Sequence, residues 1–119
     1  MVARVFAVSG FIAAGCTAAA AEDLSGNYLV KGTLANGMRY SVSAEIVMTS
    51  ETTCDINWSD GSKGVCMLDG KTLSIGSAVR GKPQLGVYQV APDGSIEGVF
   101  IDNFHGGKGI NREKLTPVH

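Results

Sequence analysis

Thr52-Thr-Cys-Asp-Ile-Asn-Trp-Ser-Asp-Gly-Ser-Lys-Gly-Val-Cys-Met-Leu68 holds the only Trp of the chain, two of its three Cys residues and an Asp-Gly turn signal. Apolar side chains alternate with polar ones at Cys54, Ile56 and Trp58, which is the period of a strand with one buried face. Ser59–Gly61 supplies the reversal, and residues 64–68 form the returning strand. The stretch therefore predicts a β-hairpin with the Trp beside its turn.

The amino terminus has the features of a signal peptide spanning residues 1–21. Arg4 is its positive charge, Val5–Ala14 its short apolar run, and Ala18–Ala21 supplies small residues for cleavage. The apolar run is shorter than the roughly 20 residues that a membrane span needs. We therefore expect no membrane span, a single mature domain over residues 22–119, and export to the periplasm, cell surface or medium.

A lipoprotein is the alternative interpretation of the same segment. Ala13-Ala14-Gly15-Cys16 resembles a bacterial lipobox, with Ala13 standing where Leu is usual. Cys16 would then be acylated and would anchor the protein to a membrane surface.

The other two cysteines predict a disulfide bond. Cys16 is removed or lipidated in either interpretation, so Cys54 and Cys66 remain as a pair in an exported protein, where a disulfide is favoured over a metal or redox site. If Ser59–Gly61 closes the hairpin, Trp58 pairs with Ser62 and Cys54 lies opposite Cys66. Opposed residues are near enough for a bridge in the closer, non-hydrogen-bonded type of pair. Two free buried thiols are the alternative.

The remaining sequence predicts further short strands joined by tight turns. The chain has 16 Gly, only 7% aromatic residues, and strong turn signals such as Asn36-Gly37 and Pro92-Asp-Gly94. Pro83 lacks an N–H, so we expect Arg80–Gln84 to be a polar loop, and we expect Thr116–His119 to be a tail. The expected strands are Gly26–Thr33, Arg39–Thr49, residues 53–58, residues 64–68, Thr72–Val79, Leu85–Val90, Ser95–Ile101 and Lys108–Leu115.

This succession of hairpins predicts an all-β fold, a small up-and-down antiparallel barrel of about eight strands, with a β-sandwich as the alternative. The interior of such a barrel is filled by side chains or holds one small ligand. The formal net charge of -1, with both signs scattered, argues against a nucleic-acid-binding surface.

Several motifs resemble the small exported bacterial β-domain proteins often labelled fibronectin-binding. The matching motifs are Gly26-x-Tyr28, Gly32-Thr33, Asn36-Gly37 with Tyr40, Ile56-x-Trp58, Leu73-x-Ile75, Gly86-Val-Tyr-Gln-Val-Ala-Pro-Asp-Gly-Ser-Ile-x-Gly98 and Glu113-x-Leu-Thr-Pro117. Phe104-His-Gly-Gly-Lys-Gly109 departs from the family, in which a Trp-containing strand end is common. The resemblance implies a barrel that binds a host matrix protein such as fibronectin.

Few residues of the sequence suggest a catalytic or metal-binding site, so we expect neither an enzyme nor a cofactor. Asp102 and His105 form a carboxylate–imidazole pair, but no second ligand with suitable spacing accompanies them. We expect them to lie in a solvated loop, without a metal. The terminal His119 is expected to be disordered.

The large aromatic side chains are the remaining candidates for function. We expect Tyr40 and Phe100 to fill the barrel, and we consider Trp58, Tyr28 and Tyr88 as binding residues. The sequence thus predicts a non-enzymatic exported binding protein whose partner is an extracellular protein or a small ligand. The alternatives to fibronectin binding are a lipocalin- or avidin-like ligand carrier and a periplasmic hydrolase inhibitor that uses Arg80–Gln84 or Asp102–Lys108.

Overall fold

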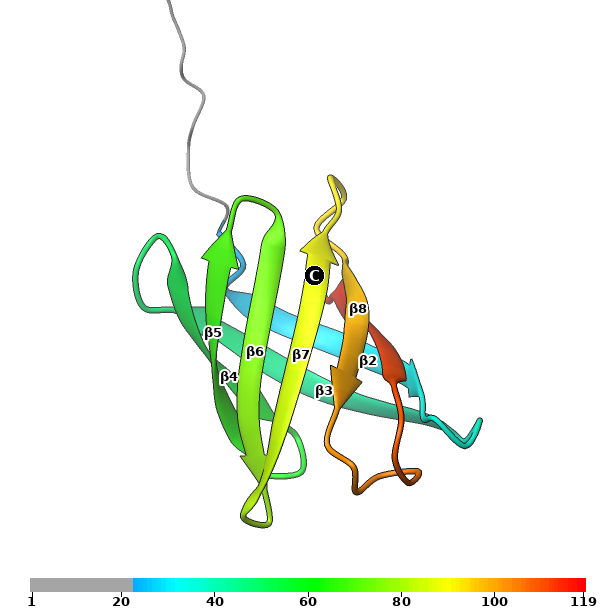
Figure 1. Cartoon of the computed structure of the whole chain (residues 1–119). Coiled ribbons are helices and arrows are strands. Elements are labelled where there is room, and N and C mark those ends of the chain that lie inside the picture. Colours follow the sequence, from blue (N-terminus) through cyan, green and yellow to red (C-terminus); the bar gives the residue numbers. More distant parts are fainter. Residues whose placement is uncertain (1–22) are drawn as a thin grey trace, which may run out of the picture.

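The computed structural model describes residues 23–119, which form a closed antiparallel barrel. The eight strands follow one another in chain order around the barrel (Figure 1). They are β2 (Gly26–Thr33), β3 (Arg39–Met48), β4 (Thr53–Trp58), β5 (Lys63–Asp69), β6 (Thr72–Val79), β7 (Lys82–Val90), β8 (Ile96–Ile101) and β9 (Asn111–Pro117). The up-and-down barrel expected from the sequence is confirmed. The signal peptide and Cys16 lie outside the described residues.

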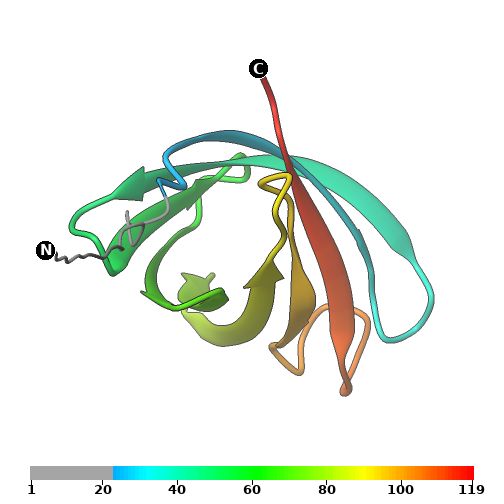
Figure 2. The same ribbon diagram turned by 90° about the horizontal axis from the view of Figure 1, so that it is seen from above.

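Pairing between the first and last strands closes the barrel. Residues 28–33 of β2 pair with residues 112–117 of β9, and the view from above shows the resulting ring (Figure 2). Closure removes the two unpaired strand edges that an open meander would leave exposed. Over residues 23–119 no helix is long and apolar enough to cross a membrane.

The alternating patterns place apolar side chains inside, and one end of the barrel is densely packed. Val30, Ile46, Ile56, Leu73 and Leu115 are fully buried there. Burying a side chain of this size contributes about 1.5–3 kcal/mol. This packed end is the hydrophobic core that stabilises the barrel.

The hairpin of β4 and β5 contains the expected disulfide. Cys54 pairs with Cys66 in the register, their Cα atoms are 4.9 Å apart, and their sulfur atoms are bonded. The Trp58 N–H donates to the Ser62 carbonyl at 2.9 Å, as a three-residue loop requires. Because Cys54 lies four residues from Trp58, the alternation places the cysteines in a hydrogen-bonded pair. The expectation that the two cysteines form a non-hydrogen-bonded pair is therefore wrong, although the disulfide bond itself is present.

The expected loop over Arg80–Gln84 is wrong. Arg80 and Gly81 both have positive φ (53° and 76°) and form a two-residue turn. Pro83 already pairs with Ala78 of β6. Its missing N–H costs no ladder bond because β7 begins to pair with β8 only at Leu85.

The last strand also differs from the expectation. It begins at Asn111 instead of Lys108 and continues through Pro117, so Thr116 and Pro117 are paired residues and not a tail. The pairing with β2 that closes the barrel decides this end, and no local pattern in residues 108–119 reveals it.

Candidate functional site

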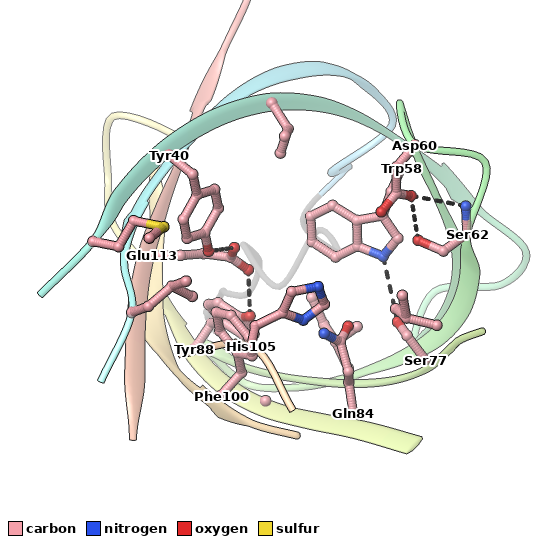
Figure 3. Close-up of a pocket in the computed structure, with 16 residues that line it drawn as sticks. Tyr40, Trp58, Asp60, Ser62, Ser77, Gln84, Tyr88, Phe100, His105 and Glu113 are labelled. Atoms are coloured by element: carbon pink, nitrogen blue, oxygen red, sulfur yellow. Dashed lines mark hydrogen bonds between the residues drawn. The ribbon is translucent and has the colours of Figure 1, made fainter. Parts of the chain in front are cut away.

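The end of the barrel opposite the packed core encloses a cavity of about 340 Å³ (Figure 3). It lies beside the β4–β5 turn, the β8–β9 loop and the start of β3. Its wall combines aromatic, aliphatic and polar side chains: Tyr40, Trp58, Tyr88 and Phe100; Leu34, Met38, Val42, Ile75 and Val79; Asp60, Ser62, Ser77, Gln84, His105 and Glu113. This volume falls within the range of pockets that hold small molecules.

Glycines at inward-facing positions explain why this end is hollow. Gly32 of β2 and Gly86 of β7 lie at inward-facing positions of their strands. The inward-facing positions closer to the packed end hold Val30 on β2 and Val90 on β7. A Cβ atom on Gly32 would overlap the Tyr40 ring, and one on Gly86 would lie 2.5 Å from Cε1 of Tyr88. The two tyrosine rings therefore lie flat against glycine backbone, which leaves space in the middle of the barrel.

Gly98 supports the same arrangement from β8. A Cβ atom there would lie 2.6 Å from the Cα atom of Tyr88, in the strand that pairs with β8. A glycine inside a strand often marks such a close approach of two backbones.

A buried carboxylate joins the two tyrosines. Glu113 of β9 is 7% exposed and accepts hydrogen bonds from Tyr40 OH at 2.5 Å and Tyr88 OH at 2.6 Å. Burial raises the pKa of Glu113, and the two phenol hydrogen bonds oppose this rise. The pKa values of both tyrosines are raised, first by burial and then by the neighbouring Glu113 charge. Both phenols consequently remain protonated and act as donors.

Trp58 forms the wall opposite Glu113 (Figure 3). Its indole Nε1–H donates to Ser77 Oγ at 3.3 Å, which fixes the plane of the ring. Trp58 is partly buried, packs against the core on one side and lines the cavity on the other. Trp58 is therefore a residue of the cavity wall.

Asp102 holds the β8–β9 loop in place at the open end of the cavity, which we call its mouth. Because the Asp102 side chain is buried, the expectation that it lies in a solvated loop is wrong. The Asp102 side chain is 1% exposed, whereas His105 is 40% exposed. One carboxylate oxygen contacts His105 Nδ1 at 2.7 Å and accepts from Gln84 Nε2 at 2.8 Å. The other accepts the N–H groups of Phe104 and His105. Asp102 thereby folds the loop inward, so that His105 reaches the cavity.

These contacts determine the charge of the mouth. Burial acts to raise the pKa of Asp102, but hydrogen bonds from His105, Gln84 and two backbone N–H groups outweigh it and lower the pKa. On the β4–β5 turn, hydrogen bonds from Ser62 lower the pKa of Asp60 despite the opposing effect of burial. Both carboxylates are therefore ionised at neutral pH.

The binding residues suggested by the sequence are separated by the fold. Trp58 and Tyr88 line the cavity, whereas Tyr28 lies at the packed end, where its OH donates to the Leu24 carbonyl at 2.7 Å. Tyr40 and Phe100 were expected to fill the barrel and instead line the cavity.

Sequence reasoning missed Glu113 as a site residue. Its signal was an acidic residue at an inward position of β9, between Asn111 and Leu115, which are both fully buried. Within residues 23–119, no three His, Cys, Asp or Glu side chains converge on a possible metal site.

Comparisons with known proteins give matches at the level of structure alone. No family model matches the chain, and no curated protein matches it. A redesigned β-barrel matches with a TM-score of 0.69 and 16% identity, covering 81% of this chain and 92% of the other. A de novo designed fluorescence-activating β-barrel matches with a TM-score of 0.58 and 20% identity, covering 79% and 93%.

A third solved structure, EF1p2_mFAP2b bound to DFHBI, has a TM-score of 0.61 and 17% identity, covering 80% of this chain and 94% of the other. At these identities the likeness supports the barrel fold alone. The resemblance to fibronectin-binding proteins stays a prediction.

Proposed function

We propose that this protein binds a small hydrophobic ligand inside the open end of its barrel. The observation that carries this proposal is the cavity of about 340 Å³ with four aromatic side chains and a few fixed polar groups on its wall. Apolar walls with a few oriented polar groups are typical of small-molecule sites. Two barrels of similar fold add support, because one is described as fluorescence-activating and the other was solved bound to DFHBI.

The polar groups are oriented before any ligand arrives, which favours binding over a structural role alone. Glu113 is fixed by two phenols, and Trp58 by Ser77. A rigid site loses little conformational entropy when it takes up a ligand. The barrel thus supplies a preformed pocket.

Titration with N-phenyl-1-naphthylamine tests the proposal, because this uncharged probe becomes fluorescent in apolar surroundings. We expect saturable one-to-one binding by the oxidised protein. Val42→Trp should weaken binding at least about tenfold because Val42 lines the cavity and the larger side chain fills it.

Val47→Trp is the matched control, since Val47 lies on the same strand but is 41% exposed on the outer face. It should bind the probe like the unchanged protein. Absence of saturable binding, or equal binding by the two variants, would overturn the proposal.

We keep fibronectin binding as a second proposal, because one feature of the outer surface favours a protein partner. Val65, Leu85 and Ile101 are exposed apolar residues on β5, β7 and β8. They lie in one row across the sheet, because Val65 and Leu85 both pair with Gly76 of β6, and Leu85 also pairs with Ile101. Large exposed apolar patches are found at protein interaction sites. Solid-phase binding to fibronectin tests the proposal, and a Leu85→Ser variant should lose affinity. Lack of saturable binding by the unchanged protein would remove this partner.

A further inference from the structure

The hydrogen-bonding groups on the cavity wall are unbalanced in favour of acceptors. Five polar side chains already direct a donor to a protein acceptor, namely Tyr40 and Tyr88 to Glu113, Trp58 to Ser77, Gln84 to Asp102, and Ser62 to Asp60. A carboxylate has about four acceptor positions. Each Glu113 oxygen therefore has a lone pair to spare after its tyrosine has donated, and a ligand that carries donors suits this wall.

The charges on the wall have the same sign. Among the lining residues that the structure describes, Asp60 and Glu113 are acidic, and none is Lys or Arg. Lys63 and Arg80 line a neighbouring depression, which shares Asp60 and His105 with this wall. A ligand anion inside the cavity would meet the buried charge of Glu113, with no Lys or Arg on the wall to offset it, and buried unpaired charge is costly.

The aromatic side chains complete the pattern. Tyr40, Tyr88 and Trp58 surround the space in front of the Glu113 carboxylate (Figure 3). The faces of such rings attract a cation within about 6 Å of the ring centre, most strongly where water is excluded. A carboxylate beside several aromatic rings is therefore a site for an ammonium group.

We propose that the cavity selects hydrophobic amines, with the ammonium group bound by Glu113 and the apolar body packed on Trp58. This inference rests on the proposed function. The ammonium would donate to the spare lone pairs of both Glu113 oxygens while the phenols keep their own bonds. It would also offset the charge of a carboxylate that is only 7% exposed. No rearrangement of the tyrosines is needed, because the ligand uses acceptors that they leave free.

Three probes of nearly equal size and shape test this selection. They are 2-(1-naphthyl)ethylamine, 2-(1-naphthyl)ethanol and 1-naphthylacetate, titrated by calorimetry at pH 7 into the oxidised protein. We expect the amine to bind at least about tenfold more tightly than the alcohol, because hydrogen bonds to charged groups are the stronger ones. We expect the acetate to bind more weakly than either.

Glu113→Gln identifies the group responsible. It keeps the shape of the side chain, so the alcohol should still bind, and the preference for the amine should fall below about threefold. Asp55→Asn is the control, because Asp55 is exposed on the outer face of β4 and does not line the cavity, and it should leave the preference in place.

A second measurement covers the case in which Glu113→Gln does not fold. Protonation of Glu113 in the unchanged protein should remove the amine preference at low pH. Tyr40, Tyr88, Asp60 and His105 are the other titratable groups on the wall. Repeating the measurement with an Asp60→Asn variant separates the effect of Asp60. Retention of the preference in acid would overturn the assignment to Glu113.

The outcomes distinguish this inference from the proposed function. If none of the three probes binds, and N-phenyl-1-naphthylamine does not bind either, the proposed function fails and the inference fails with it. If the alcohol or the acetate binds as tightly as the amine, the ligand cavity stands and the selection of amines is wrong.

Discussion

Replacing Gly86 by alanine should destabilise the barrel through the site. The added Cβ atom would lie 2.5 Å from Cε1 and 2.8 Å from the hydroxyl oxygen of Tyr88. Both distances are well inside van der Waals contact, so the ring must move. It cannot move easily, because Gly98 packs against its other side and its OH is bonded to Glu113.

Two costs contribute to the expected loss. Forcing an extra carbon into a packed site costs about 1–3 kcal/mol. Displacing the phenol from Glu113 weakens a hydrogen bond to a charged group, although water entering the open cavity replaces part of it. We therefore expect Gly86→Ala to lower the free energy of unfolding by about 2–4 kcal/mol, and for a domain of this size each kcal/mol lowers Tm by about 4–8 °C.

Gly76→Ala is the matched control. Gly76 lies on the neighbouring strand β6, and nothing lies within 4 Å of an added Cβ atom. This variant should be neutral or gain up to about 1 kcal/mol, because alanine reduces the freedom of the unfolded chain. Urea denaturation of both variants provides the measurement. A difference below about 0.5 kcal/mol would refute the reasoning that Gly86 exists to accommodate the tyrosine ring.

Three other changes have defined outcomes. Replacing both Cys54 and Cys66 by alanine should cost about 3 kcal/mol in urea denaturation, because the bridge closes a loop with a sequence separation of 12; unchanged stability would contradict a formed disulfide. Tyr28→Phe should cost about 1–3 kcal/mol because the buried Leu24 carbonyl loses its donor, while N-phenyl-1-naphthylamine binding should not change. Burial raises the pKa of Glu113 above its ordinary 4.5, so the native state retains the proton over a window in which the unfolded state releases it. Stability should therefore fall as pH rises through that window, and Glu113→Gln should flatten this slope in urea denaturation measured at successive pH values.

The hairpin around Trp58 shows how far local spacing carries a prediction. Alternation and the Asp-Gly turn indicate two strands and a three-residue loop, and the disulfide between Cys54 and Cys66 follows from that register. The type of ladder pair was wrong because it depends on which residue next to the turn begins the hydrogen-bonding alternation.

The neighbouring turn shows where local spacing misleads. Pro83 suggested a loop, since proline cannot donate in a ladder. In the barrel its N atom lies at a position without a partner strand, because β8 ends before reaching it. Such a position depends on the relative lengths of three strands, which no short stretch of sequence encodes.

The alternating pattern, the turn residues and the two cysteines by themselves determined an all-β meander with a cross-linked hairpin, because strand period and turn chemistry involve residues close together in the chain. Only the tertiary structure decided that β2 pairs with β9 and that one end of the barrel is hollow. Tyr40, Tyr88 and Glu113 come from three different strands and meet only after closure. Their meeting depends on the stagger of strands around the barrel, which is a property of the whole sheet.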